Sequence, residues 1–201
     1  MSPRGVAIPD VRSRLFEAAD RVLEGSGPAG LSSRAIAAEA GTAAGLLFRH
    51  FADLDEFLAA YVASRVDRVR ETARVWLSRP GSGTVAANLT GAALSIAPTA
   101  SSLIDIVHGR PSLAVRLMAD RHLHRAGIDQ LEEAFAGYLE AERDLGRVAR
   151  DTDTQAIAMA LVASVHQLSL RHDRADGDTA ARIRRVVGAL ASEISAEPPA
   201  G

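Results

Sequence analysis

The fold is decided by residues 31–51, which read LSSRAIAAEAGTAAGLLFRHF. Ser32 and Ser33 are helix-capping residues that stand directly before an apolar pattern, so a short helix is expected to begin here. Gly41 suits a left-handed C-cap that ends this helix, and Thr42 can cap a second one. Two short helices joined by a tight glycine turn form a helix-turn-helix, whose second helix enters the major groove of DNA.

Ten positions in this stretch follow a pattern of apolar, hydroxyl, basic, small and aromatic residues: Leu31, Ser32, Ser33, Arg34, Ile36, Ala37, Ala40, Gly41, Phe48 and His50. In this pattern and in the residues that follow to Leu58, the chain resembles the N-terminal signature of the TetR family of transcriptional regulators. The resemblance implies an all-α fold. It places a three-helix DNA-binding domain at residues 1–58, joined by a long helix to an effector-binding and dimerisation domain at residues 59–201.

Composition agrees with a helical protein that stays inside the cell. The chain has 201 residues, of which 47% are hydrophobic, and alanine and leucine dominate, which favours helices. It has no cysteine, which excludes disulfides and thiolate metal sites. The start of the chain shows no signal-peptide pattern, and the uncharged run at residues 154–170 is too short and too polar to span a bilayer. We therefore expect a cytoplasmic protein with no membrane partner.

The formal net charge of −2 shows no basic bias. Residues 1–58 contain six arginines and eight acidic residues. Since phosphate affinity depends on local cations, the arginines must share a face for DNA to bind.

Helical spacing, caps and breakers predict the remaining elements. A first helix is expected at residues 10–24, and a long one at residues 54–78. At ~1.5 Å per residue the long helix reaches nearly 40 Å and joins the two domains. The rest of the chain is predicted to form helices at residues 85–96, 100–108, 111–124, 129–144, 154–172 and 179–196, with breaks at Pro98 and Gly127 among others.

Eight residues are predicted to form the DNA-binding site: Ser32, Ser33, Arg34, Thr42, Ala43, Leu46, Arg49 and His50. Ala43 and Leu46 are suited to thymine methyl groups, and Arg34 to guanine. The alternative is helix capping for the serines and a solvated surface charge for the arginines. Family members often carry polar residues where this chain has Ala43, Ala44, Leu46, Phe48 and Leu54, and Phe48, lacking a hydroxyl, is predicted to lie in the core.

Two helices near the C-terminus carry apolar stripes that are predicted to form a homodimer interface: Ile157, Leu161, Val165, Ile183, Val187, Leu190 and Ile194. Two half-sites on DNA would give such a dimer its specificity, and the resemblance implies the same arrangement. The alternative is that both stripes close the core of the single chain.

The resemblance also implies a small-molecule effector that binds in a helical cavity. Its predicted lining is Trp76, Leu94, Ile104, His108, Met118, His122, Phe135, Tyr138, Met159 and His166, although each of these suits plain core packing as well. His122 and His124 lie two apart and so splay on a helix, which argues against a metal site. No motif for a catalytic centre or a cofactor is present, and we expect no enzyme activity.

These observations favour a ligand-responsive DNA-binding transcriptional regulator, a repressor that a small molecule releases from its operator. The partners would be an operator in double-stranded DNA, the effector and a second copy of the chain. Two alternatives remain: a helical adaptor that keeps the fold without operator binding, and a small helical enzyme that uses a histidine.

Overall fold

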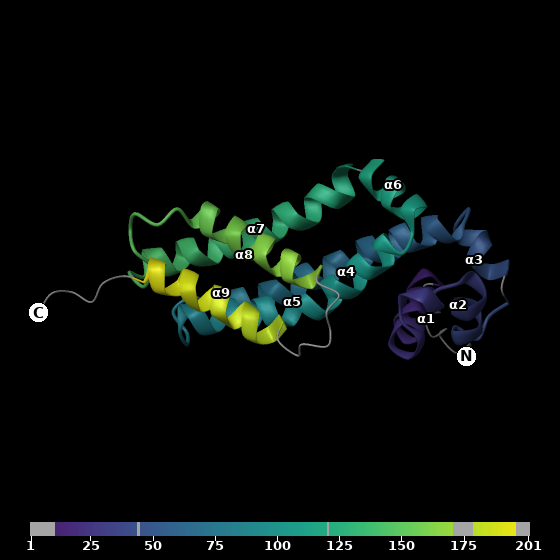
Figure 1. Cartoon of the computed structure of the whole chain (residues 1–201), viewed down its shortest axis with the longest axis horizontal. Coiled ribbons are helices and arrows are strands. Elements are labelled where there is room, and N and C mark those ends of the chain that lie inside the picture. The colour runs from purple at the N-terminus through teal and green to yellow at the C-terminus, as the bar shows by residue number, and fades with distance from the viewer. Residues whose placement is uncertain (1–10, 44, 120, 171–178, 196–201) are drawn as a thin grey trace, which may run out of the picture. The chain divides into compact units, whose positions relative to one another are not determined.

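The computed structural model describes residues 11–43, 45–119, 121–170 and 179–195, with the backbone alone for residues 121–126. Within these ranges the chain is all-α, which confirms the predicted fold class (Figure 1). It divides into two compact units. Unit 1 comprises residues Met1–Ala63 and Asp105–Ala119, and unit 2 comprises Ser64–Ile104 and Asp120–Gly201. Each unit is described by itself.

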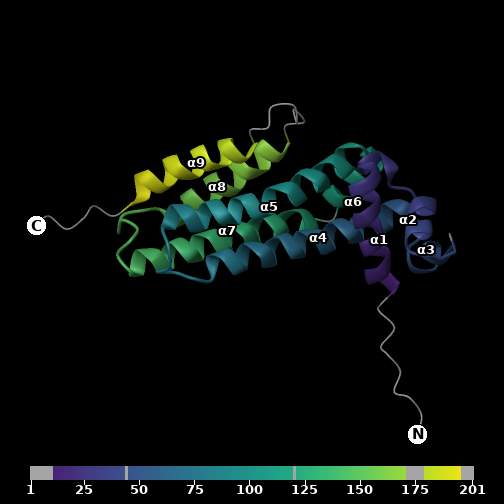
Figure 2. The same cartoon turned by 90° about the horizontal axis from the view of Figure 1, so that it is seen from below.

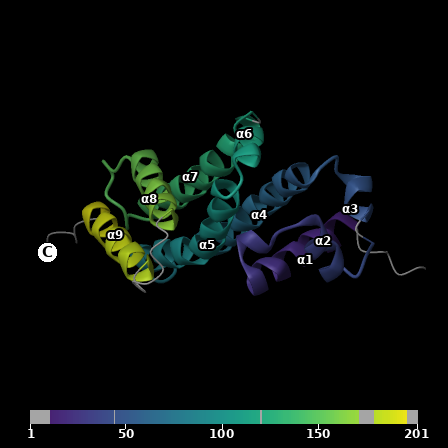
Figure 3. The same ribbon diagram turned by 45° about the vertical axis from the view of Figure 1, so that its right-hand side comes forward.

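Unit 1 is built from seven elements or parts of elements: α1 (Val11–Ser26), the short 3-10 helix η1 (Pro28–Gly30), α2 (Ser33–Glu39), α3 (Gly45–His50), the start of α4 (Leu54–Leu77), the end of α5 (Val85–His108) and α6 (Pro111–Ala119). Helices α1 and α2 lie side by side (Figure 3). The unit therefore combines the predicted helix-turn-helix with a helix from much later in the chain, α6.

The core of unit 1 contains a cluster of four aromatic rings. Phe57 is fully buried, and its ring lies 5.5 Å from Phe16, 5.2 Å from Phe51 and 6.4 Å from Tyr61, measured between centroids. The Tyr61 hydroxyl donates a 2.6 Å hydrogen bond to Asp20 of α1. The cluster thus joins α1, the residue after α3 and the first turns of α4.

Unit 2 is a helical bundle formed by the remainder of α4 and α5 together with α7 (Arg121–Asp144), α8 (Thr154–Ser169) and α9 (Thr179–Ile194). Helix α8 packs against α7 and lies beside α9 (Figure 2). Its core draws on all five helices, with Ala73, Leu89, Phe135, Leu161 and Ile183 among the buried residues.

Helix α5 does not break at Pro98, and the prediction of two helices at residues 85–96 and 100–108 is wrong. Proline cannot donate a hydrogen bond to the carbonyl of residue 94, which normally weakens a helix. Here the chain on both sides is held by packing, since Ile96 and Leu103 are buried while Pro98 is exposed. Tertiary burial outweighs the local penalty.

Among the described residues, α5 is the one helix whose length and composition would suffice to cross a membrane. Most of it, up to residue 104, lies in an uncharged run at residues 80–104, which is longer than the run at 154–170 considered in the sequence analysis. Its residues Leu89, Ala92 and Ile96 belong to the core of unit 2. We therefore interpret α5 as a core helix, which passes the same test of length and composition.

Helix α7 runs through Gly127, where the sequence predicted a break. A Cβ atom added to Gly127 would lie 2.6 Å from Cγ1 of Val66 on α4, which is too close for any real contact. Val66 is β-branched, so its side chain has little freedom to move aside. This glycine lets two helices approach closely and is not a helix terminator.

A buried polar network holds the loop between α4 and α5 against the end of α7. The Glu142 side chain is fully buried, and its Oε1 accepts a 3.2 Å hydrogen bond from the amide of Gly81. Its Oε2 lies 3.3 Å from Nε of Arg147. Arg147 also donates to the carbonyl of Gly83, and Asn88 donates a 2.8 Å hydrogen bond to the Tyr138 hydroxyl.

We expect the stability of unit 2 to fall as the pH rises from about 10 to about 12. Burial and, to a smaller extent, its hydrogen bond to Glu142 together raise the pKa of Tyr138 from 10.0 to about 12. The unfolded chain loses this proton first, so ionisation favours unfolding between the two pKa values, whereas below the lower one the contribution is fully present. Denaturant unfolding at about pH 9 and about pH 11.5 checks this. Tyr138→Phe should lose less stability over that interval than the wild type, and an equal loss would contradict the assignment.

Candidate nucleic-acid interface

Helix α2 begins with a side-chain cap, as the sequence predicts. Ser32 has an extended backbone, with φ −141° and ψ 156°, and its Oγ accepts a 3.1 Å hydrogen bond from the amide of Ala35. This bond satisfies one of the amides left free at a helix N-terminus. The buried residues Ile36 and Ala37 then anchor the helix.

The turn after α2 is closed by two backbone hydrogen bonds. The amide of Thr42 donates to the carbonyl of Ala37 at 2.9 Å, and the amide of Gly41 donates to that of Ala38 at 3.1 Å. Gly41 has a φ of 64°, a conformation that glycine adopts at low cost. This pair of bonds is a Schellman motif, and it fixes the direction in which the chain leaves α2.

Helix α3 is anchored on one side and open on the other. Leu47 is buried within it and Phe51 directly after it, whereas Arg49 and His50 are exposed. Phe48 is 51% exposed, so the prediction that it lies in the core is wrong. The physical reason is the helical turn: Leu47 and Phe51 lie four residues apart on one face, which turns the intervening Phe48 away from the core.

Arginines of α1 hold the end of α2, a role that the sequence analysis did not assign. Nε of Arg21 lies 2.6 Å from Oε1 of Glu39, and Arg14 donates a 3.2 Å hydrogen bond to the carbonyl of Ala40. Glu39 is the last residue of α2, where the helix dipole disfavours a negative charge. The unfavourable place of Glu39 at the end of a helix is the one feature of the sequence that indicates that this glutamate has a basic partner.

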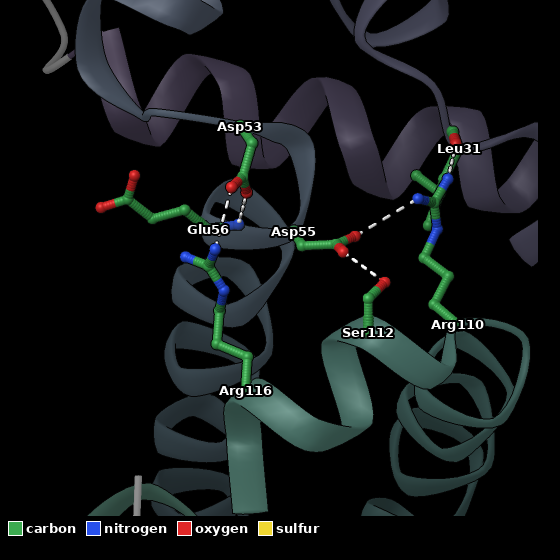
Figure 4. Close-up of polar contacts among 7 residues, drawn as sticks. All are labelled: Leu31, Asp53, Asp55, Glu56, Arg110, Ser112 and Arg116. Carbon is green, nitrogen blue, oxygen red and sulfur yellow. Dashed lines mark hydrogen bonds and ion pairs between the residues drawn. The ribbon is translucent and has the colours of Figure 1, made fainter. Parts of the chain in front are cut away.

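The N-terminus of α4 carries a capping box formed by Asp53 and Glu56. Oδ1 of Asp53 accepts a 2.7 Å hydrogen bond from the amide of Glu56, and Oε2 of Glu56 accepts one from the amide of Ala52. The other Asp53 oxygen accepts a 2.8 Å bond from Arg116 of α6 (Figure 4). Helix α6 therefore binds directly to the start of α4.

A second set of contacts is made by residues at the start of α6. Arg110 donates a 2.8 Å hydrogen bond to the carbonyl of Leu31 and forms a 3.4 Å ion pair with Asp55, whose other oxygen accepts a bond from Ser112 (Figure 4). Leu31 directly precedes the cap of α2. We call the contacts of Arg110, Ser112 and Arg116 with Leu31, Asp53 and Asp55 the α6 clamp.

These contacts neutralise part of the acidic charge of the N-terminal stretch. Glu39, Asp53 and Asp55 each pair with an arginine, and two of those arginines come from beyond residue 58. By contrast, Arg34 and Arg49 are exposed and make no ion pair with the part of the chain that the structure describes. They are the cations of the helix-turn-helix that remain available to phosphate.

All eight predicted DNA-binding residues lie on α2, on α3 or in the turn between them. Ser32, Arg34, Ala43, Arg49 and His50 are exposed, and Ser33, Thr42 and Leu46 are half-buried. The Oγ1 of Thr42 donates a weak 3.4 Å hydrogen bond to Ala37, and Ser32 is used as a cap.

Residues 15–61 match the sequence model of the family described as bacterial regulatory proteins, tetR family. This range includes the capped α2, the Schellman turn and α3. Over this range the chain is similar to that family. No curated protein matches its sequence.

Several solved structures resemble this chain in fold over nearly its whole length. Reduced E. coli NemR superposes with a TM-score of 0.71 at 13% identity, covering 95% of this chain and 100% of that one. A TetR transcriptional regulator from Streptomyces coelicolor gives 0.64 at 18% identity, covering 93% and 99%. SmeT, the repressor of the Stenotrophomonas maltophilia multidrug efflux pump SmeDEF, gives 0.64 at 17%, covering 92% and 91%. The chain thus shares the fold of these three structures.

The residues predicted to line an effector cavity differ widely in burial. Met118 on α6 is 72% exposed, and Trp76, His108, Met159 and His166 are also exposed. Leu94 and Ile104 are half-buried, while Phe135 and Tyr138 belong to the core of unit 2. The His122 side chain lies outside the described residues. The composition of an effector site in this protein stays a prediction.

The residues predicted to form the dimer interface pack within the single chain. Leu161, Val165, Ile183, Val187 and Ile194 are buried in the core of unit 2, and Ile157 and Leu190 pack against that core. This is the arrangement expected if both stripes close the core of the single chain. An interface on α8 and α9 would therefore use their exposed faces, where Met159 is 55% exposed.

Proposed function

We propose that this protein is a ligand-responsive repressor that binds its operator as a homodimer in the cytoplasm and is released by a small molecule. One observation carries the DNA-binding part: the capped helix-turn-helix leaves Arg34 and Arg49 exposed while its one acidic residue, Glu39, is paired with Arg21. Repression is supported by the structural likeness to SmeT, which is itself a repressor.

Ligand response would require an effector that prefers one of two conformations of the protein. The chain offers a physical path for this coupling. Helices α4 and α5 each contribute to both units, and α5 leads directly into the α6 clamp on the helix-turn-helix. We propose that residues 59–201 supply effector binding and dimerisation, with α6 as the part of that stretch that acts on the DNA-binding residues.

Operator binding is tested by fluorescence anisotropy with DNA from upstream of the protein's own coding region and a shuffled control, at low and near-physiological salt. We expect a preference for the upstream DNA that persists at the higher salt. The double variant Arg34→Ala/Arg49→Ala should weaken binding at least about tenfold, because each bidentate base contact contributes ~1–3 kcal/mol. Arg74→Ala is the matched control, since Arg74 is an exposed arginine of unit 2.

Equal binding to both DNAs that collapses with salt would call for a wider operator search, and its failure would favour the adaptor. With a confirmed operator, small molecules can be screened for release of the complex. The absence of any effect across a broad screen would contradict the ligand-responsive part and leave DNA binding intact.

A further inference from the structure

The exposed surface of α3 includes apolar side chains that are not needed to anchor the helix to the core. Phe48 is 51% exposed and Leu46 is half-buried, although the fold is already anchored by Leu47 and Phe51. Ala43, in the turn before the helix, is exposed as well. An aromatic ring held in water on a six-residue helix gains free energy from any apolar surface that covers it.

The polar groups near α3 are largely engaged in the fold. The hydroxyl of Ser32 caps α2, that of Thr42 donates to the Ala37 carbonyl, and Arg14 and Arg21 bind the end of α2. Direct hydrogen bonding to base edges is therefore left mainly to Arg34 on α2 and to Arg49 and His50 on α3. Beside them, α3 presents the exposed ring of Phe48 and the half-buried side chain of Leu46.

In the major groove one feature distinguishes base pairs by apolar contact, the C5 methyl group of thymine. We infer, building on the proposed operator binding, that α3 selects its DNA chiefly by thymine methyl groups, with Phe48 and Leu46 as specificity-determining residues. Arg49, next to Phe48 and exposed, supplies charge complementary to the phosphates on the same helix. That charge favours DNA as the occupant of this apolar face over a second copy of the chain.

The test uses the operator identified by anisotropy, with individual thymines replaced by deoxyuridine. This replacement removes the methyl group and leaves the hydrogen-bonding edge unchanged. At thymines that α3 reads, the wild type should lose affinity about fourfold per methyl group, the equivalent of ~0.8 kcal/mol for one buried carbon. Deoxyuridine at positions outside the protected site serves as the control and should leave the affinity unchanged.

Variants identify the residues that read the methyl groups. Phe48→Ala and Leu46→Ala should each bind the thymine and uracil forms equally at the position that the side chain covers. Phe48→Leu, which keeps an apolar side chain, should retain binding and part of the discrimination. Arg49→Ala should bind both forms more weakly with the ratio between them preserved.

The possible failures are distinguishable. If the wild type prefers its operator yet binds every uracil form equally well, this inference is overturned and the proposed function stands. If Phe48→Ala and Leu46→Ala keep full discrimination, these residues do not read the methyl groups. If no operator is found and Phe48→Ala instead abolishes self-association, the apolar face binds a second copy, and both proposals fail.

Discussion

Replacing Phe57 with alanine is expected to unfold unit 1 and abolish operator binding. Phe57 is fully buried and its ring contacts those of Phe16, Phe51 and Tyr61. Removing a buried phenylalanine ring costs about 3–5 kcal/mol, because the surrounding side chains only partly fill the cavity. Natural domains are stable by about 5–15 kcal/mol, so this loss takes up a large share of what holds α1 and α4 together.

The two units allow the loss to be located. The single tryptophan, Trp76, lies in unit 2, so its fluorescence follows that unit during denaturant unfolding. Circular dichroism follows both units, and operator anisotropy follows unit 1. For the circular dichroism midpoint alone, Phe48→Ala is the matched control, since Phe48 is a half-exposed phenylalanine of the same unit. A Phe57→Ala protein whose circular dichroism midpoint equals that of Phe48→Ala would contradict the role given to the aromatic cluster.

Arg147→Ala should destabilise unit 2 by a comparable amount. Glu142 is fully buried, and the arginine is its one cationic partner among the described residues. Removing one member of a buried ion pair costs about 3–5 kcal/mol, because the remaining charge is left without compensation. The bond from Arg147 to the Gly83 carbonyl is lost as well, which frees the loop between α4 and α5.

Trp76 fluorescence during urea unfolding measures this effect. Arg74→Ala is the control, because its ion pair with Glu71 is exposed and such pairs contribute ~0–1 kcal/mol. The second variant Arg147→Ala/Glu142→Gln removes the buried charge and should recover part of the stability. If Arg147→Ala and Arg74→Ala unfold at the same urea concentration, the buried pair does not stabilise the unit.

The helix-turn-helix could be predicted because its signals are local. A capping serine, a glycine that the structure shows at φ 64° and an apolar pattern all act within one or two helical turns. The breaks expected at Pro98 and Gly127 failed for the opposite reason. Whether these residues end a helix depends on partners distant in sequence, such as Val66, which packs against Gly127.

The surface of the candidate site was predicted less completely. Phe48 was assigned to the core because it lacks the hydroxyl that would contact phosphate. Arg110 and Arg116 had no local signal at all, since their partners Asp55 and Asp53 lie 55 and 63 residues away in the chain. Charge pairing at such distances follows from the tertiary fold and cannot be read from spacing.

The α6 clamp has a consequence for the modularity of this regulator. A fragment that stops after residue 63 would contain the recognition helix and its caps, but Asp53, Asp55 and the Leu31 carbonyl would lose the partners supplied by Arg110, Ser112 and Arg116. The DNA-reading part is therefore not a contiguous cassette that can be excised or grafted onto another sensor. A functional chimera would have to exchange residues 105–119 together with the N-terminal segment. Only then would Asp53 and Asp55 keep their arginine partners.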